Sequence, residues 1–102
     1  MIYNRLEMDY TKHYKLLVEK HGTKIKPEKG YYELHHIVPR CMGGNDDNNN
    51  LVYFTARCHL LAHWLLSRIY PNNYEISHAF GMMCFMKNKL QIERKTPPLH
   101  IL

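Results

Sequence analysis

The hydrophobic pattern in the first part of the chain changes from a helical period to a strand period. In residues 9–21 the apolar side chains fall at i, i+4, i+7 and i+8. This spacing predicts an amphipathic helix with Asp9 as its N-cap and Gly22 just past its end. Residues 31–38 are instead rich in aromatic and β-branched side chains, and Pro39 follows them. They predict a strand on which neighbouring residues point to opposite faces.

The second part of the chain predicts one more strand and two more helices. Residues 39–50 consist largely of turn formers, and the apolar run 51–54 predicts a strand that pairs with the first. A helix is predicted over residues 55–70, with the threonine at its start as N-cap. Another is predicted over 73–86, where Asn72 and a glutamate three residues on form a capping signature. The expected fold is therefore α+β, with two short antiparallel strands flanked by helices.

Size and charge narrow the class of protein without indicating a reaction. A chain of 102 residues is expected to form a single domain. Residues 89–102 form a polar and basic tail, and the last ten residues are expected to be loosely held. The net charge of +5 and the pI of about 9.2 favour a polyanionic partner such as a nucleic acid.

Cysteine usage and hydropathy indicate the compartment. The cysteines are odd in number and lack CxxC spacing, which argues against a disulfide framework or a four-cysteine zinc site; they are Cys41, Cys58 and Cys84. No stretch approaches the ~18–20 apolar residues of a membrane span, and no signal peptide opens the chain. We therefore expect a cytoplasmic protein that does not contact a membrane.

Four histidines lie on the predicted strand–loop–strand–helix unit. His59 and His63 are four residues apart on the predicted helix, so both face the same way and can bind one cation. His35 and His36 are neighbours on the first strand and point to opposite faces, which favours two separate roles. A strand histidine would complete a facial set of metal ligands. The fourth imidazole has the pKa range of a general base near neutral pH.

The order and spacing of these residues resemble the HNH nucleases, which have the ββα-metal (His-Me finger) fold. Within that family the chain resembles small phage-encoded HNH homing endonucleases. The resemblance spans about 31 residues and is carried by four segments, which are Glu33-Leu-His35-His36-Ile-Val-Pro39, Gly43-Gly44, Asn50-Leu-Val and Thr55-Ala-Arg-Cys-His59-Leu-Leu-Ala-His63. One departure is Cys58, where family members commonly carry a glutamate. Thr55 is therefore expected to cap its helix without a capping box.

The resemblance implies a role for each residue of the motif. His35, His59 and His63 would hold one divalent cation, and His36 would activate the attacking water as general base. Asn50 would brace the loop so that His36 faces the scissile phosphate. The implied reaction is hydrolysis of DNA phosphodiester bonds, in which the cation stabilises charge on the phosphate and on the departing 3′ oxygen.

The residue types of the motif bear on the cation and on the substrate. Three imidazoles suit Zn²⁺, Ni²⁺ or Mn²⁺ better than Mg²⁺. Arg40 and Arg57 are candidate phosphate contacts on a DNA substrate that is expected to be double-stranded. Because one ββα unit cuts one strand, a double-strand break would need a homodimer or two successive events.

Two other functions would use the same histidines. A non-catalytic DNA-binding module would have a structural metal, with His36 or Cys41 as its fourth ligand. A colicin-like toxin nuclease would share the chemistry but would be paired with an inhibitor protein. A phage-type homing or nicking endonuclease, acting in the cytoplasm of an infected bacterium, is the preferred hypothesis.

Overall fold

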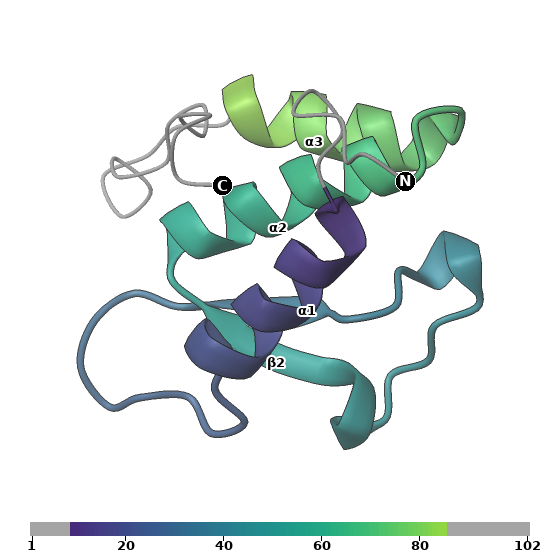
Figure 1. Ribbon diagram of the computed structural model, residues 1–102. Coiled ribbons are helices and arrows are strands. Elements are labelled where there is room, and N and C mark those ends of the chain that lie inside the picture. Colours follow the sequence, from purple (N-terminus) through teal and green to yellow (C-terminus); the bar gives the residue numbers. More distant parts are fainter. Residues whose placement is uncertain (1–8, 86–102) are drawn as a thin grey trace.

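The structure of the protein is a computed structural model that describes residues 9–85. This described part contains two strands, three α-helices and two short 3-10 turns (Figure 1). In chain order they are α1 (Tyr10–His21), β1 (Glu33–His36), η1 (Arg40–Met42), η2 (Asn48–Asn50), β2 (Leu51–Phe54), α2 (Ala56–Ile69) and α3 (Tyr74–Phe85). The predicted α+β class, with two antiparallel strands followed by a helix, is confirmed.

β1 and β2 form an antiparallel sheet with one buried face and one exposed face. His35 lies opposite Val52 in the register, and both side chains are buried. Phe54, two residues further along the same face of β2, is also fully buried. Leu34 and its partner Tyr53 lie on the other face, where Leu34 is 45% exposed. The predicted alternation is therefore confirmed, and the residues next to His35 point away from the core.

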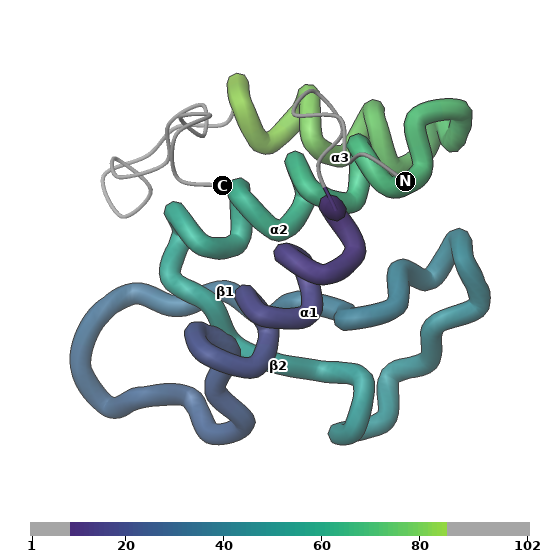
Figure 2. The backbone as a smooth tube through the Cα atoms, in the orientation of Figure 1, coloured from purple at the N-terminus to yellow at the C-terminus, as the bar shows by residue number. Residues whose placement is uncertain are grey.

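Helix α2 is the central element, because it packs against α1, α3 and the sheet. Figure 2 shows α3 along one side of α2 and the strands on the other, with α1 crossing in front. Burial of apolar side chains among these elements is the main force that holds the fold together. The buried core consists of Tyr14, Leu17, Val52, Phe54, Ala62, Trp64, Leu65, Leu66 and Ile76. None of the helices in residues 9–85 has the length and apolar character that crossing a bilayer requires.

Side-chain caps define where the helices begin. Asp9 accepts a hydrogen bond from the amide three residues on at 3.0 Å, as predicted. Thr55 caps α2 in the same way at 3.2 Å. The prediction of Asn72 as the cap of α3 was wrong by one residue, since Asn73 accepts from the amide three residues on at 3.1 Å. The Asn73 amide also donates to the Tyr70 carbonyl, so Asn72 lies inside a tight turn and not at the helix start.

The lengths of the elements differ from the sequence-based prediction. The strand predicted over 31–38 is shorter in the structure, where β1 has four residues. All four pair with the four residues of β2. On α3, Met82 is 49% exposed, whereas Met83 is buried. The predicted end of α3 at residue 86 and the tail 89–102 lie outside the described residues.

Candidate metal centre

Three histidine side chains meet between β1 and α2. β1 positions His35, and α2 positions His59 and His63 one turn apart on a single face. One ring nitrogen from each residue lies within 4.8 Å of the others. The ring centroid of His35 is 5.1 Å from that of His59 and 5.2 Å from that of His63, and the two α2 rings are 4.8 Å apart. The structure thus brings together the three imidazoles that the sequence suggested as cation ligands.

His35 is almost completely buried, at 1% exposed. Burial, and then the imidazoles of His63, His59 and His36, lower its pKa from 6.5 to about 2. The ring is therefore neutral near pH 7, which is the state in which imidazole binds metals. Its Nδ1 is buried and has no hydrogen-bond partner among the described residues. A buried nitrogen without a hydrogen-bond partner is unfavourable unless a ligand binds it.

The donor set fits a divalent transition metal. Imidazole nitrogens suit Zn²⁺, Ni²⁺ and Mn²⁺, and a three-residue set leaves coordination positions for water or substrate. Within residues 9–85, neither His36 nor Cys41 belongs to the group of close ligand atoms. Cys41 is exposed on η1. The arrangement therefore resembles an open, catalytic type of site more than a closed tetrahedral one.

Glu33 orients one of the three imidazoles and was not among the predicted site residues. Its Oε1 lies 2.7 Å from Nδ1 of His59, and the two side chains are only 12% and 15% exposed. An ionised carboxylate can only accept, so Nδ1 of His59 donates and Nε2 keeps its lone pair. Tyr31 donates to the other carboxylate oxygen at 2.5 Å. The strand period was the available signal, because it puts Glu33 on the same face as His35.

His36 does not join the other three histidines. Its side chain is 25% exposed, and Nε2 lies 2.7 Å from Oδ1 of Asp46. Arg40 donates to the same oxygen through Nε at 3.1 Å and a terminal nitrogen at 2.8 Å. The hydrogen bonds from His36 and then Arg40 lower the pKa of Asp46, so this carboxyl is ionised and accepts. Neutral His36 therefore carries its hydrogen on Nε2 and a lone pair on Nδ1.

Asn50 closes the loop that joins β1 to β2. It is 8% exposed, and its Oδ1 accepts from the Val38 amide at 2.8 Å. Its Nδ2 donates to the carbonyls of Val38 and Asn45 at 3.1 and 2.8 Å. Gly44 allows this close approach, since a Cβ there would lie 1.8 Å from the Val38 carbonyl oxygen. The Asn50 side chain thus fastens the loop to the segment directly after His36.

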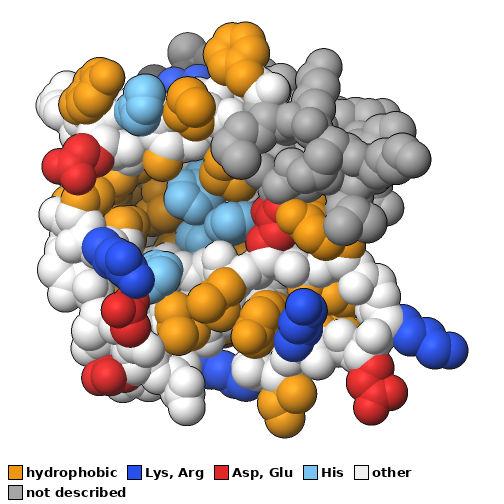
Figure 3. All heavy atoms as spheres, turned by 180° about the vertical axis from the view of Figure 1, so that it is seen from behind, with side chains coloured by type: hydrophobic (Ala, Val, Ile, Leu, Met, Phe, Trp, Pro, Cys, Tyr) orange, Lys and Arg blue, Asp and Glu red, His pale blue; other side chains and the backbone are white. Residues whose placement is uncertain are grey.

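The two arginines suggested as phosphate contacts have different surroundings. Arg57 is exposed in the first turn of α2, and Arg40 is paired with Asp46 although its side chain is 69% exposed. Figure 3 shows histidine side chains gathered in a hollow at the centre of one face, with acidic and basic side chains around it. This hollow lies on the side of the molecule that is turned away from the viewer in Figure 1.

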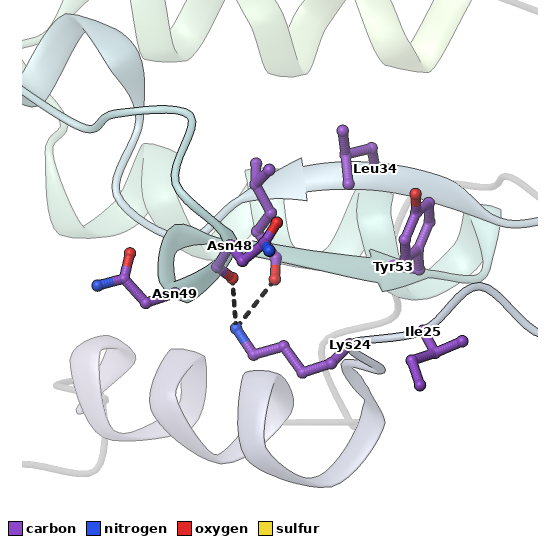
Figure 4. Close-up of a pocket in the computed structure, with 7 residues that line it drawn as sticks. Lys24, Ile25, Leu34, Asn48, Asn49 and Tyr53 are labelled. Atoms are coloured by element: carbon purple, nitrogen blue, oxygen red, sulfur yellow. Dashed lines mark hydrogen bonds between the residues drawn. The ribbon is translucent and has the colours of Figure 1, made fainter.

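A groove of about 500 Å³ lies on the other face of the sheet (Figure 4). Leu34 and Tyr53 line it from the strands, on the face opposite His35. Lys24 also lines it, and its ammonium group donates to the carbonyls of Asn48 and Leu51 at 2.9 and 3.0 Å. Within residues 9–85, no histidine, cysteine or carboxylate side chain lines this groove. The candidate metal ligands His35, His59 and His63 lie elsewhere, in the histidine hollow.

Two antiparallel strands followed by a helix, with histidines of the first strand and the helix facing one another, define the ββα-metal class of protein. The sequence model of the HNH endonuclease family matches residues 21–64, a range that contains both strands and much of α2. Over this range the chain is similar to the HNH endonuclease family.

Several curated relatives come from Enterobacteria phage T4. Probable mobile endonuclease E is 50% identical over 80 residues, which are 78% of this chain and 55% of that protein. Probable mobile endonuclease D is 48% identical over 77 residues, which cover 72% of this chain and 29% of that protein. Probable mobile endonuclease C is 49% identical over 65 residues, covering 62% and 31%. The chain thus spans about half of the first relative and about a third of the others. No solved structure matches it.

Proposed function

We propose that this chain is a metal-dependent DNA endonuclease that hydrolyses phosphodiester bonds, and that residues 1–102 form a single nuclease domain. The observation that carries the proposal is the group of three imidazoles whose ligand atoms lie within 4.8 Å of one another. A buried His35 Nδ1 that has no partner in the described part of the chain supports a ligand at this point. The match of residues 21–64 to the HNH endonuclease family and the net charge of +5 support DNA as the substrate.

His35, His59 and His63 are the proposed ligands of one divalent cation. Imidazole donors favour Zn²⁺, Mn²⁺ or Ni²⁺ over Mg²⁺, which prefers oxygen. Glu33 holds the His59 ring so that Nε2 is the atom available for the cation. When bound, the cation supplies positive charge that stabilises the phosphate and the departing 3′ oxygen.

His36 is the proposed general base. Asp46 accepts the hydrogen on Nε2, so the lone pair on Nδ1 can accept a proton from water. Arg40 holds the Asp46 carboxylate through two hydrogen bonds. Asn50 fastens the loop that follows His36, which limits the movement of the base.

The proposed hydrolysis consumes one water molecule for each bond cut. The water oxygen forms a bond to phosphorus while its proton passes to Nδ1 of His36. The bond between phosphorus and the 3′ oxygen then breaks, and that oxygen takes a proton from solvent. The expected ends are therefore a 5′-phosphate and a 3′-hydroxyl, and His36 releases its proton to solvent before the next cycle.

Contacts to the DNA backbone are proposed for Arg57 and Arg40. Arg57 is exposed in the first turn of α2, where the helix dipole also favours a phosphate. Arg40 lies beside the proposed base and shares Asp46 with it. Double-stranded DNA is the proposed substrate, and because one unit cuts one strand, a homodimer would be needed for a concerted double-strand break.

A phage homing or nicking role is proposed from the relatives, which are named as mobile endonucleases of phage T4. Such a protein would act in the cytoplasm of the infected bacterium. A structural metal site is less well supported, because neither His36 nor Cys41 is within the group of close ligand atoms in residues 9–85. A colicin-like toxin is also less well supported, because none of the reported relatives is named as a toxin.

Plasmid nicking tests the proposal directly. Protein stripped of metal by a chelator should not cut supercoiled plasmid, and addition of Zn²⁺, Mn²⁺, Ni²⁺ or Mg²⁺ in turn should restore nicking with at least one cation. We expect His36→Ala to lower the cutting rate by roughly 10²–10⁴-fold, the usual contribution of a general base, while keeping its metal. Mapping of the cut ends should find 5′-phosphates.

A matched control is His21→Ala, which removes an exposed imidazole at the end of α1. This variant should cut like the unmodified protein. If folded, metal-loaded His36→Ala cuts at full rate, the assignment of the base is wrong. If the unmodified protein cuts DNA with none of the four cations, the nuclease proposal itself is wrong.

A further inference from the structure

A tyrosine on α1 contacts the buried histidine through its hydroxyl group. Tyr14 is 7% exposed, and its hydroxyl lies 2.7 Å from Nε2 of His35. The same hydroxyl lies 2.5 Å from the carbonyl oxygen of Ile37. The two ring centroids are 6.0 Å apart with the rings nearly edge to face. This tyrosine lies outside the range 21–64 that matches the family.

The positions of the two partners decide which group donates each hydrogen. A carbonyl oxygen can only accept, so the single hydrogen of the Tyr14 hydroxyl goes to Ile37. The hydroxyl oxygen then has only lone pairs to offer to Nε2 of His35. Nε2 must therefore carry the hydrogen of that contact, and the neutral His35 ring is left with a lone pair on Nδ1.

This tautomer agrees with a second, independent observation. Nδ1 of His35 is the buried side-chain nitrogen that has no hydrogen-bond partner within residues 9–85. A protonated Nδ1 would be a buried donor without an acceptor, whereas a lone pair on Nδ1 can bind a cation that His59 and His63 also reach. His59 has the opposite arrangement, since Glu33 takes the hydrogen on its Nδ1 and leaves Nε2.

We propose that Tyr14 is a positioning residue that holds His35 in the Nε2–H tautomer, so that Nδ1 is the atom presented to the metal. In its metal-binding part this inference rests on the proposed function. Tyr14 relays the hydrogen bond of the ring to the backbone of Ile37, directly after the strand that carries His35. The orientation of the ring is thereby coupled to the packing of α1 against the rest of the molecule.

Nuclear magnetic resonance of metal-free, ¹⁵N-labelled protein tests the tautomer without any nuclease assay. Long-range ¹H–¹⁵N spectra at neutral pH should show His35 with hydrogen on Nε2 and an unprotonated Nδ1. In Tyr14→Phe the same resonances should move towards a mixture of tautomers, because the oxygen that accepts from Nε2 is gone. A His35 ring that is protonated on Nδ1 in the unmodified protein would overturn the proposal.

Metal affinity provides the second measurement. Competition titration with Zn²⁺ should show that Tyr14→Phe binds about 10–100-fold more weakly, the usual effect of losing a partner of a metal-binding histidine. The matched control is Tyr10→Phe, one turn earlier on α1, whose ring packs edge-on against Trp64 with centroids 5.8 Å apart. It removes the same hydroxyl group from the same helix and should bind Zn²⁺ within about two-fold of the unmodified protein.

The outcomes separate this inference from the proposed function. Equal Zn²⁺ affinity in folded Tyr14→Phe and in the unmodified protein would overturn the role of Tyr14. If Tyr14→Phe does not fold, the tautomer of His35 in the unmodified protein still decides the matter. A third outcome is that the tautomer and the loss of Zn²⁺ affinity are as expected but the unmodified protein cuts DNA with none of the cations. The role of Tyr14 then stands, and the nuclease proposal is rejected.

Discussion

Each histidine of the candidate site that has a carboxylate neighbour is held through one ring nitrogen. Glu33 takes the hydrogen on Nδ1 of His59, and Asp46 takes the hydrogen on Nε2 of His36. The ring nitrogen that does not face a carboxylate is therefore Nε2 in His59 and Nδ1 in His36. In the proposed function, the position of the neighbouring carboxylate thus suits one imidazole to metal binding and the other to proton transfer.

The buried state of His35 predicts how the stability of the metal-free protein depends on pH. In the folded protein the pKa of His35 is lowered to about 2, whereas in the unfolded chain it is near 6.5. Between these values the unfolded chain binds more protons, so this contribution to stability is complete above pH 6.5 and is lost as the pH falls. We expect a loss of up to about 1.4 kcal/mol per pH unit from this one group.

Urea unfolding of the chelated protein between pH 7 and pH 5 measures this effect. His35→Gln replaces the imidazole by a polar side chain that does not titrate. The free energy of unfolding of this variant should fall less steeply with decreasing pH. The difference in slope should approach about 1.4 kcal/mol per pH unit, which corresponds to one bound proton. Identical slopes for the two proteins would show that His35 does not remain neutral in the folded state.

At the scale of elements, the loop between β1 and β2 is fastened by one buried amide. Asn50→Ala removes three side-chain hydrogen bonds and leaves polar groups of Val38 and Asn45 without their partner. At about 0.5–1.5 kcal/mol for each bond, we expect the free energy of unfolding to fall by about 2–4 kcal/mol. Urea denaturation measures the change. Asn49→Ala, an exposed neighbour on η2, is the control and should cost under about 0.5 kcal/mol.

Local patterns were sufficient to predict most element positions and the histidine group. The apolar run 51–54, the caps Asp9 and Thr55, and the helical spacing of His59 and His63 depend on neighbours in sequence, and the structure agrees with them. They are set by backbone geometry and side-chain period, which a sequence displays directly.

The remaining features depend on contacts between distant segments. The length of β1 is limited by its partner strand, and Tyr14 has the same spacing as any other core residue of α1. Asp46 is one of several acidic and amide residues in a turn-rich loop, and its contact with His36 joins positions ten apart. A sequence pattern does not encode these distances, so the supporting side chains of Tyr14 and Asp46 were not identified as part of the site.

At the scale of the whole molecule, the candidate metal centre links the sheet to the central helix. Because binding to the folded state stabilises it by mass action, a cation at 100 times its dissociation constant should raise the free energy of unfolding by about 2.7 kcal/mol. Thermal unfolding with and without Zn²⁺ measures this shift. His63→Ala removes one proposed ligand and should abolish most of it.

The comparison for this prediction is His78→Ala, which changes an exposed histidine on α3 that stacks on Tyr74. It should keep the full stabilisation by Zn²⁺. An equal Zn²⁺ effect in His63→Ala and His78→Ala would place the stabilising cation somewhere other than the centre between β1 and α2.

The two adjacent glycines of the loop are constrained in different ways, with a consequence for how this sequence can vary. Gly43 has a φ of 91°, a conformation that asparagine and aspartate also adopt at moderate cost. Gly44 does not have a positive φ. Any side chain at this position would nevertheless displace the Val38 carbonyl that Asn50 binds. We therefore expect related sequences to replace Gly43 by other residues but to keep Gly44. The Asn50 side chain can reach the Val38 carbonyl only if the residue at position 44 has no side chain.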